Sequence, residues 1–173
     1  PPPRRNAVSV MRRSAEHLAG LIEWLLDISK IEAGRLELNH DEVRIGEFLD
    51  QLVEMFQLHA SAKGIDFEFR ASGALPAVVY TDEQRLRQIL INLLSNAIKF
   101  TNKGRVSLGV RYRNQVAEFE IQDTGIGIKA EDIQRIFEPF ERGDLAPIQA
   151  APGMGLGLTI AKLLTEIMGG EIS

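Results

Sequence analysis

The chain has 173 residues, which is enough for one compact domain with an extension. Its 20 basic and 24 acidic residues, with 45% hydrophobic and 25% charged residues, are typical of a soluble globular protein and argue against a general nucleic-acid-binding surface. Cysteine is absent, which excludes a disulfide framework and a cysteine-based zinc site and fits a reducing compartment.

The first part of the chain predicts a linker followed by a long helix. Residues 1–5 are rich in proline, and apolar residues recur at helical spacing from about residue 6 until Gly34, a residue placed to end the helix. The apolar positions are Met11, Leu18, Leu21, Ile22, Leu25, Ile28 and Ile31. Nothing else in the first forty residues can cover this stripe, so we expect it to pair with another chain or with a helix outside this sequence. Docking on its own domain is the alternative.

Strands and helices are mixed along the rest of the chain. The spacing of apolar residues predicts strands at 35–39, 65–70, 78–80, 106–112 and 117–121, and helices at 45–63, 82–100, 133–137 and 157–168. Thr81 and Gln84 form a capping-box pattern, 106–112 and 117–121 should form an antiparallel hairpin, and 171–173 resemble the start of a strand. We therefore expect an α+β sandwich of one sheet and one helical layer.

The segment from Arg85 to Thr101 carries an unusual polar arc. Asn92, Asn96 and Lys99 are spaced four and three residues apart, which places them in a narrow arc beside the apolar stripe at about 100° per residue. Asn is a poor helix former, so two of them on a helix suggest an oxygen-rich anion with its metal. A polar face without a ligand is the alternative, and this helix alone does not decide between them.

A carboxylate and two glycines follow the second strand of the predicted hairpin. Asp123 can accept a hydrogen bond from an exocyclic amine, while Gly125 and Gly127 let a flat ring approach the backbone. A plain turn with aspartate at its first position is an equally valid interpretation of these residues alone.

Three alternating glycines precede the last predicted helix. At Gly153, Gly155 and Gly157, backbone N–H groups and the helix dipole favour an anion, although flexible loops are also rich in glycine. The spacing fits neither a Rossmann fingerprint nor a Walker-type phosphate loop.

The order of these motifs resembles the catalytic, ATP-binding domain of two-component sensor histidine kinases, in the superfamily that includes gyrase and heat-shock chaperone ATPases. The resemblance extends from about Val10 to Ser173. The matching segments are Arg85–Thr101 (the N box), Asp123–Gly127 (first glycine box), Phe137–Phe140 (F box), Gly153–Gly157 (second glycine box) and Ser29–Gly34 (end of the second dimerisation helix).

The resemblance implies a fold and two domains. The fold would be a two-layer α/β sandwich of the histidine kinase/gyrase type, with a mixed, mainly antiparallel sheet and one helical layer, preceded by a long bundle helix. Residues 1–34 would be a partial dimerisation helix with a linker, and 35–173 the ATP-binding catalytic domain with its C-terminal strand truncated.

The resemblance also implies roles for the polar residues. Asn96 would hold Mg²⁺, Asn92 would support the metal or the phosphates, and Lys99 would neutralise phosphate charge. Arg142 would reach the γ-phosphate when a lid closes, and Asp123 would accept from the adenine amino group. The other residues implied to contact the nucleotide are Phe100, Gly125, Gly127, Gly153, Gly155, Gly157 and Leu158.

The chemistry expected is transfer rather than hydrolysis. Chaperone- and gyrase-like members carry Glu near the position of Asn92, and a carboxamide cannot take a proton from water. None of His17, His40 and His59 is followed by the family's acceptor pattern. We therefore expect the acceptor histidine on a dimerisation helix absent from this chain, so this fragment alone should not phosphorylate itself.

The expected function is that of an ATP- and Mg²⁺-dependent protein-histidine kinase in two-component signalling. The expected partners are ATP, a second copy through the N-terminal helix of the full protein, and a response regulator receiver domain, without nucleic acid. No apolar run approaches the ~20 residues that span a bilayer, so this segment should not contact a membrane and should lie in the cytoplasm, free or as part of a membrane-bound sensor. The alternatives are a nucleotide-binding dimerisation module without transfer and an ATP-hydrolysing machine, which Asn92 disfavours.

Overall fold

The computed structural model divides into two compact units, Pro1–Leu38 and Asn39–Ser173. The residues it describes are 11–12, 15, 18–20, 22, 25–31, 33–133, 135–138 and 157–173. None of the helices formed by these residues has the length and apolar character needed to cross a membrane.

The described part of the first unit forms a helix that ends at Gly34, as the sequence predicts. All of its described residues up to 31 have helical conformation, and Gly34 follows with a φ of 61°. The Gly34 N–H donates to the Ile31 carbonyl at 2.9 Å and the Arg35 N–H to the Lys30 carbonyl at 2.8 Å, the two bonds of a Schellman cap. Several apolar side chains of this helix are more than half exposed: Met11, Leu18, Ile22, Leu25 and Leu26.

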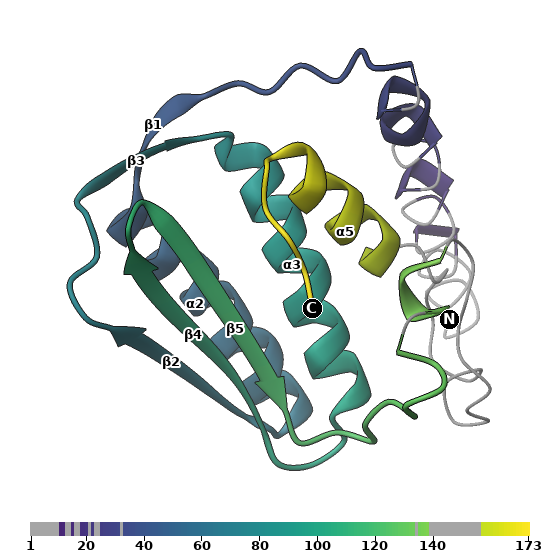
Figure 1. The fold of residues 1–173 in the computed structure, drawn as a ribbon. Helices are drawn as coiled ribbons and strands as arrows, with labels where there is room; N and C mark the ends of the chain where they lie inside the picture. Colours follow the sequence, from purple (N-terminus) through teal and green to yellow (C-terminus); the bar gives the residue numbers. More distant parts are fainter. Residues whose placement is uncertain are drawn as a thin grey trace. The chain divides into compact units, whose positions relative to one another are not determined.

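The second unit contains a three-stranded sheet and a separate two-stranded ribbon (Figure 1). The sheet has the order β2 (Asp66–Ser72), β4 (Arg105–Arg113), β5 (Val116–Asp123), with β2 and β4 parallel and β4 and β5 antiparallel. The ribbon pairs β1 (Asp41–Arg44) with β3 (Val78–Thr81) in antiparallel fashion. The expected single sheet is thus two sheets, because β3 pairs with β1 and not with a strand of the larger sheet.

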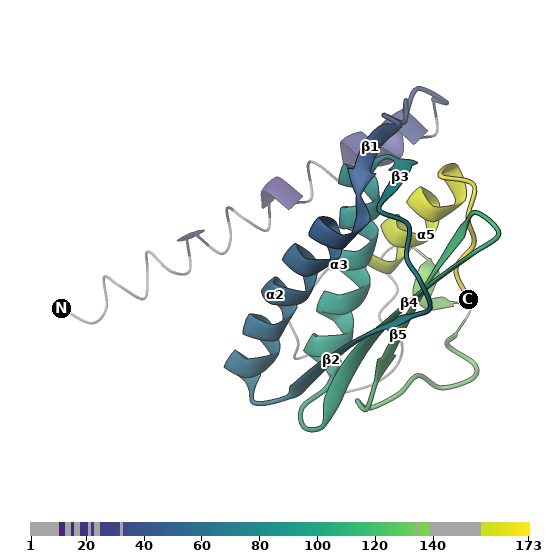
Figure 2. The same ribbon diagram turned by 90° about the vertical axis from the view of Figure 1, so that its left-hand side faces the viewer.

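Three helices lie on one face of the three-stranded sheet (Figure 2). They are α2 (Ile45–Lys63), α3 (Glu83–Phe100) and α5 (Gly157–Ile167), and a short 3₁₀ turn, η1, spans Arg135–Phe137. The apolar stripes of α2 and α3 meet the inward side chains of β4 in the core, whose most deeply buried members include Leu49, Leu52, Phe56, Leu90, Leu94, Val106 and Leu108, and α5 packs on α3. This two-layer arrangement confirms the predicted α+β fold with one helical layer.

Two local signals end α2 and turn the hairpin. Gly64 adopts a φ of 75° and caps α2, as predicted. Asn114 and Gln115 both have positive φ, 49° and 65°, which is the two-residue turn that suits a right-twisted antiparallel pair. The hairpin prediction is confirmed, and it brings Asp123 to the end of β5.

Four local predictions are wrong. Residues 35–39 form no strand, because the partner β3 offers pairing positions only to 41–44. The cap of α3 is Asp82 rather than Thr81: its Oδ1 accepts from the Arg85 N–H at 2.9 Å. Of the helix expected at 133–137, the described residues show Ile133 in a turn and Arg135–Phe137 in the 3₁₀ turn η1, and residues 171–173 form no strand.

Asp82 does more than cap α3. Only 5% exposed, it also accepts from the Asn39 N–H at 3.0 Å through Oδ2. We expect Asp82→Ala to lower the free energy of unfolding by about 2 kcal/mol, since two backbone amides lose their acceptor. Urea denaturation measures the loss, with the exposed Asp50→Ala on α2 as control. A loss below about 0.5 kcal/mol, the range of ordinary surface changes, would contradict this role.

Candidate functional site

The polar arc of α3 lies at the edge of the core. Asn92, Asn96 and Lys99 are each half-buried, while Leu94 and Ala97 on the same helix are buried. The helix and its two faces therefore agree with the prediction. Half-burial limits the freedom of these side chains while leaving them open to a ligand.

The start of α5 lies against this arc. Gly157 is the first residue of α5, and a Cβ added to it would lie 3.7 Å from the Asn92 carboxamide carbon. The N-terminal end of α5, whose first N–H groups have no partner within the helix, is therefore next to Asn92. Leu158 follows on the same turn and is half-buried.

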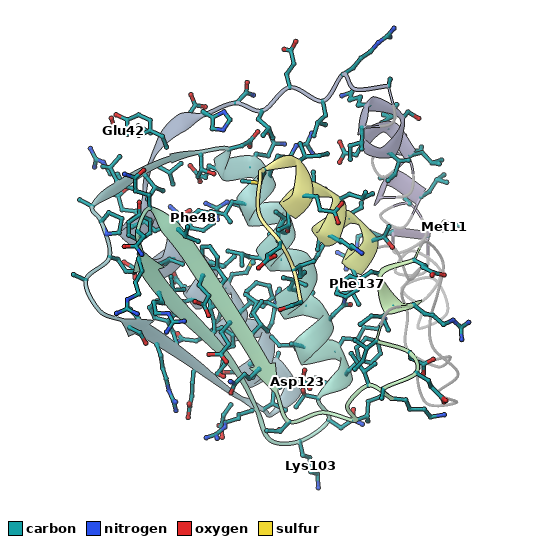
Figure 3. All side chains as sticks on the ribbon, viewed as in Figure 1. Met11, Glu42, Phe48, Lys103, Asp123 and Phe137 are labelled. Carbon is teal, nitrogen blue, oxygen red and sulfur yellow. The ribbon has the colours of Figure 1, made fainter. Side chains whose placement is uncertain are left out.

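The turn after β5 packs on the C-terminal end of α3. The Gly125 N–H donates to Asp123 Oδ1 at 2.8 Å. A Cβ added to Gly125 would lie only 2.5 Å from the Phe100 carbonyl oxygen, so no larger residue fits between the turn and the helix. Asp123 is exposed at the end of β5 (Figure 3), and Gly127 has a φ of 70°, which favours glycine.

Two further residues, which belong to none of the roles predicted from the sequence, hold this turn in place. Thr124 Oγ1 accepts from the Arg105 N–H at 3.0 Å, and the Thr124 N–H donates to the Arg105 carbonyl at 3.1 Å. Gly104, at a φ of 113°, leaves the space that Thr124 fills, because a Cβ there would overlap Thr124 Oγ1. A glycine directly before β4 was the only available signal.

Two cation–aromatic contacts involve the motif residues Phe100 and Phe137. Lys99 Nζ lies 4.8 Å from the centroid of the Phe100 ring. Phe137, on η1, has Lys162 Nζ of α5 at 5.5 Å from its ring centroid. The described end of the F-box segment is therefore in contact with the helix that begins beside Asn92.

The structure brings together part of the predicted constellation. The polar arc, the Asp123 turn and the start of α5 are joined through the two glycine contacts described above. Arg142, Gly153 and Gly155 lie outside the described residues, as do residues 139 and 140 of the predicted F box and the histidine at position 17.

Comparisons with known proteins identify the family. The family model "Histidine kinase-, DNA gyrase B-, and HSP90-like ATPase" matches residues 81–173. The autoinducer 2 sensor kinase/phosphatase LuxQ of Vibrio vulnificus is 37% identical over 96% of this chain and 20% of the relative. The histidine-protein kinase BarA of Escherichia coli is 37% identical over 99% of this chain and 19% of the relative.

The solved structures agree. Full-length ShkA in complex with AMPPNP superposes with a TM-score of 0.81 at 36% identity, covering 95% of this chain and 34% of that chain. The chain spans about a fifth of the length of the curated relatives it matches. The resemblance to sensor histidine kinases is confirmed, and the chain belongs to the histidine kinase-, DNA gyrase B- and HSP90-like ATPase family.

Proposed function

We propose that this chain is the catalytic fragment of a sensor histidine kinase, which binds Mg-ATP and transfers the γ-phosphoryl group to a histidine outside the chain. The observation that carries the proposal is the pair of glycine contacts on α3. Gly157 is close to Asn92, and Gly125 is close to Phe100. The start of α5 therefore lies beside one end of the polar arc and the Asp123 turn beside the other. Relatives named as kinases, and an AMPPNP complex of the similar ShkA, support a nucleotide as the ligand.

We assign the adenine to the Asp123 side of the site. Asp123 Oδ1 already accepts from the Gly125 N–H, which orients the carboxylate and turns Oδ2 into the acceptor for the adenine amino group. The open space at the Cβ position of Gly127 lets a planar ring approach the turn, while the Cβ position of Gly125 faces Phe100 and lets the turn pack closely on α3. Phe100, half-buried at the end of α3, is the aromatic side chain assigned to pack against the nucleotide.

The phosphates are assigned to the polar arc and the start of α5. The carboxamide oxygen of Asn96 is a suitable hard ligand for Mg²⁺, with Asn92 beside it and the Lys99 ammonium for the phosphate charge. When bound, Mg²⁺ supplies charge neutralisation between phosphate oxygens. By family resemblance we add Leu158, Gly153, Gly155 and Arg142 to the nucleotide contacts.

Transfer is favoured over hydrolysis by the chemistry of Asn92. A carboxamide has no basic site at neutral pH, so it cannot activate water as a carboxylate would. The two described histidines, His40 and His59, are exposed, and the His59 ring lies edge-on to Phe56, with 5.6 Å between the ring centroids. We therefore place the acceptor histidine on a separate helix. The second candidate function is a module that binds the nucleotide and does not transfer the phosphoryl group.

The N-terminal unit is assigned to dimerisation. We propose that residues 1–34 are part of a dimerisation helix and that 35–173 are the catalytic domain. The exposed apolar side chains of the first unit, Leu18, Ile22 and Leu25 among them, supply a surface that a second helix can cover. A receiver domain is the expected recipient of the phosphoryl group, and the cytoplasm, where ATP is available, is the expected location.

One assay separates these functions. The chain is incubated with γ-labelled ATP, Mg²⁺ and a separately supplied helical segment that contains the acceptor histidine. Label on that histidine is expected. Nucleotide binding without label would favour the interaction module, rapid phosphate release without the segment would favour a hydrolase, and an absence of ATP binding would overturn the whole proposal.

A further inference from the structure

The C-terminal turn of α3 has an unusual set of hydrogen-bond partners. The last four carbonyls of a helix have no partner within it and must find one elsewhere. The Ala97 carbonyl accepts from the Thr101 N–H at 3.1 Å and from Thr101 Oγ1 at 2.8 Å. The carbonyls of Ile98 and Lys99 accept from a single group, Lys63 Nζ, at 2.6 and 2.7 Å. Lys63 is the last residue of α2, 35 positions away from Ile98, so this is a contact between two helices.

The same turn of α3 supports the candidate nucleotide site. It carries the Lys99 and Phe100 side chains, and the Phe100 carbonyl is the surface on which Gly125 lies. Gly125 in turn orients Asp123 through its N–H. A shift of this turn by a few tenths of an ångström would therefore move the adenine side and the Lys99 side of the site together.

We propose that Lys63 is a positioning residue for the nucleotide site. Its ammonium binds the Ile98 and Lys99 carbonyls and fixes the end of α3, so that Lys99 and the Asp123–Gly125 turn keep their relative places. Lys63 acts through the backbone of α3 rather than by touching the nucleotide. Because the residue is exposed, solvent and salt screen its charge, and the geometry of its two hydrogen bonds is the main effect. The nucleotide part of this inference rests on the proposed function.

The test compares Lys63→Met with a matched control. Methionine keeps an unbranched stem of similar length and removes the donor. Lys103→Met makes the same change on the turn directly after α3, at an exposed side chain that points outward (Figure 3). Lys63→Arg serves as the conservative variant, since a guanidinium can still donate to carbonyls.

Two readouts are used, both at a temperature where circular dichroism shows every variant folded. The first is the Kd for Mg-ATP, and we expect a rise of about fivefold for Lys63→Met, with little change for Lys63→Arg or Lys103→Met. The second is the amide resonance of Gly125 in the nucleotide-free protein. We expect this resonance to move in Lys63→Met and to stay in place in Lys103→Met.

The outcomes separate the two proposals. If the wild-type chain binds no ATP, the proposed function fails, while the Gly125 resonance still tests the positioning role. If ATP binds and Lys63→Met leaves both the affinity and the Gly125 resonance unchanged, the inference is overturned, even where the melting temperature falls, because Lys63 would then be a helix cap only. Should Lys63→Met fail to fold, Lys63→Gln, whose amide is too short to reach both carbonyls, takes its place with the same criteria.

Discussion

Asn96→Ala is expected to weaken Mg-ATP binding by about a hundredfold or more and to abolish label transfer to an acceptor histidine. Asn96 is half-buried on α3, where its carboxamide is the proposed Mg²⁺ ligand. Alanine is a better helix former, so the free energy of unfolding should stay within about 0.5 kcal/mol of the wild type. Calorimetric titration with ATP, once in the presence of Mg²⁺ and once in the presence of a chelator, measures the metal-dependent part separately.

The control for Asn96 is Asn102→Ala, the same change at an exposed position on the turn after α3. It should leave nucleotide binding and its dependence on Mg²⁺ unaltered. If Asn96→Ala loses affinity equally with and without Mg²⁺, the residue contacts the nucleotide directly and the metal assignment is wrong. Unchanged affinity in both conditions would remove Asn96 from the site.

The sequence predicts the helices of the second unit well because their signals are local. In α2 and α3, apolar residues recur every three or four positions over five turns or so, and Gly64 adopts the left-handed conformation that ends α2. The β4–β5 hairpin is equally local, since its turn needs only Asn114 and a neighbour that tolerates positive φ. Such elements are specified by neighbouring residues alone.

Elements that depend on a distant partner could not be predicted in this way. The first strand lies at 41–44 rather than 35–39 because its partner is the short β3. Asp82 becomes the cap of α3 while its other oxygen accepts from Asn39, a residue 43 positions away. A carboxylate can accept both bonds, whereas the hydroxyl of Thr81 suits the local capping box only.

In the candidate site, too, local features could be predicted from the sequence and contacts with distant residues could not. The motif residues and their order are visible in the sequence, but the contacts between them are not. The two interpretations of Asp123 are compatible: its Oδ1 accepts from the Gly125 N–H, as in a plain aspartate turn, and the proposed function uses the second oxygen as the acceptor for adenine. The support from Gly104 and Lys63 comes from chain segments that no motif includes.

Gly125→Ala should affect nucleotide binding as strongly as any change at the polar arc. The new Cβ would lie 2.5 Å from the Phe100 carbonyl oxygen and 2.7 Å from Asp123 Oδ1, both far inside van der Waals contact. Either the turn lifts away from α3 or the Asp123 carboxylate rotates, and both displace the proposed adenine acceptor. We expect a loss of about a hundredfold in Mg-ATP affinity and of about 2 kcal/mol in the free energy of unfolding. Fluorescence titration and urea denaturation measure the two losses.

Substitutions at two further glycines show whether Gly125 is required because its Cβ position is blocked or because glycine tolerates unusual backbone angles. Gly127 has a φ of 70° and open space around its Cβ position, so Gly127→Asn, which tolerates that conformation, should lose less free energy of unfolding than Gly125→Ala. Gly46→Ala lies in α2 with nothing near the added atom and should be neutral or stabilising by about 0.5 kcal/mol. If Gly125→Ala instead binds Mg-ATP like Gly46→Ala, the turn after β5 has room to spare, and the close packing of Gly125 on Phe100 cannot be what places Asp123.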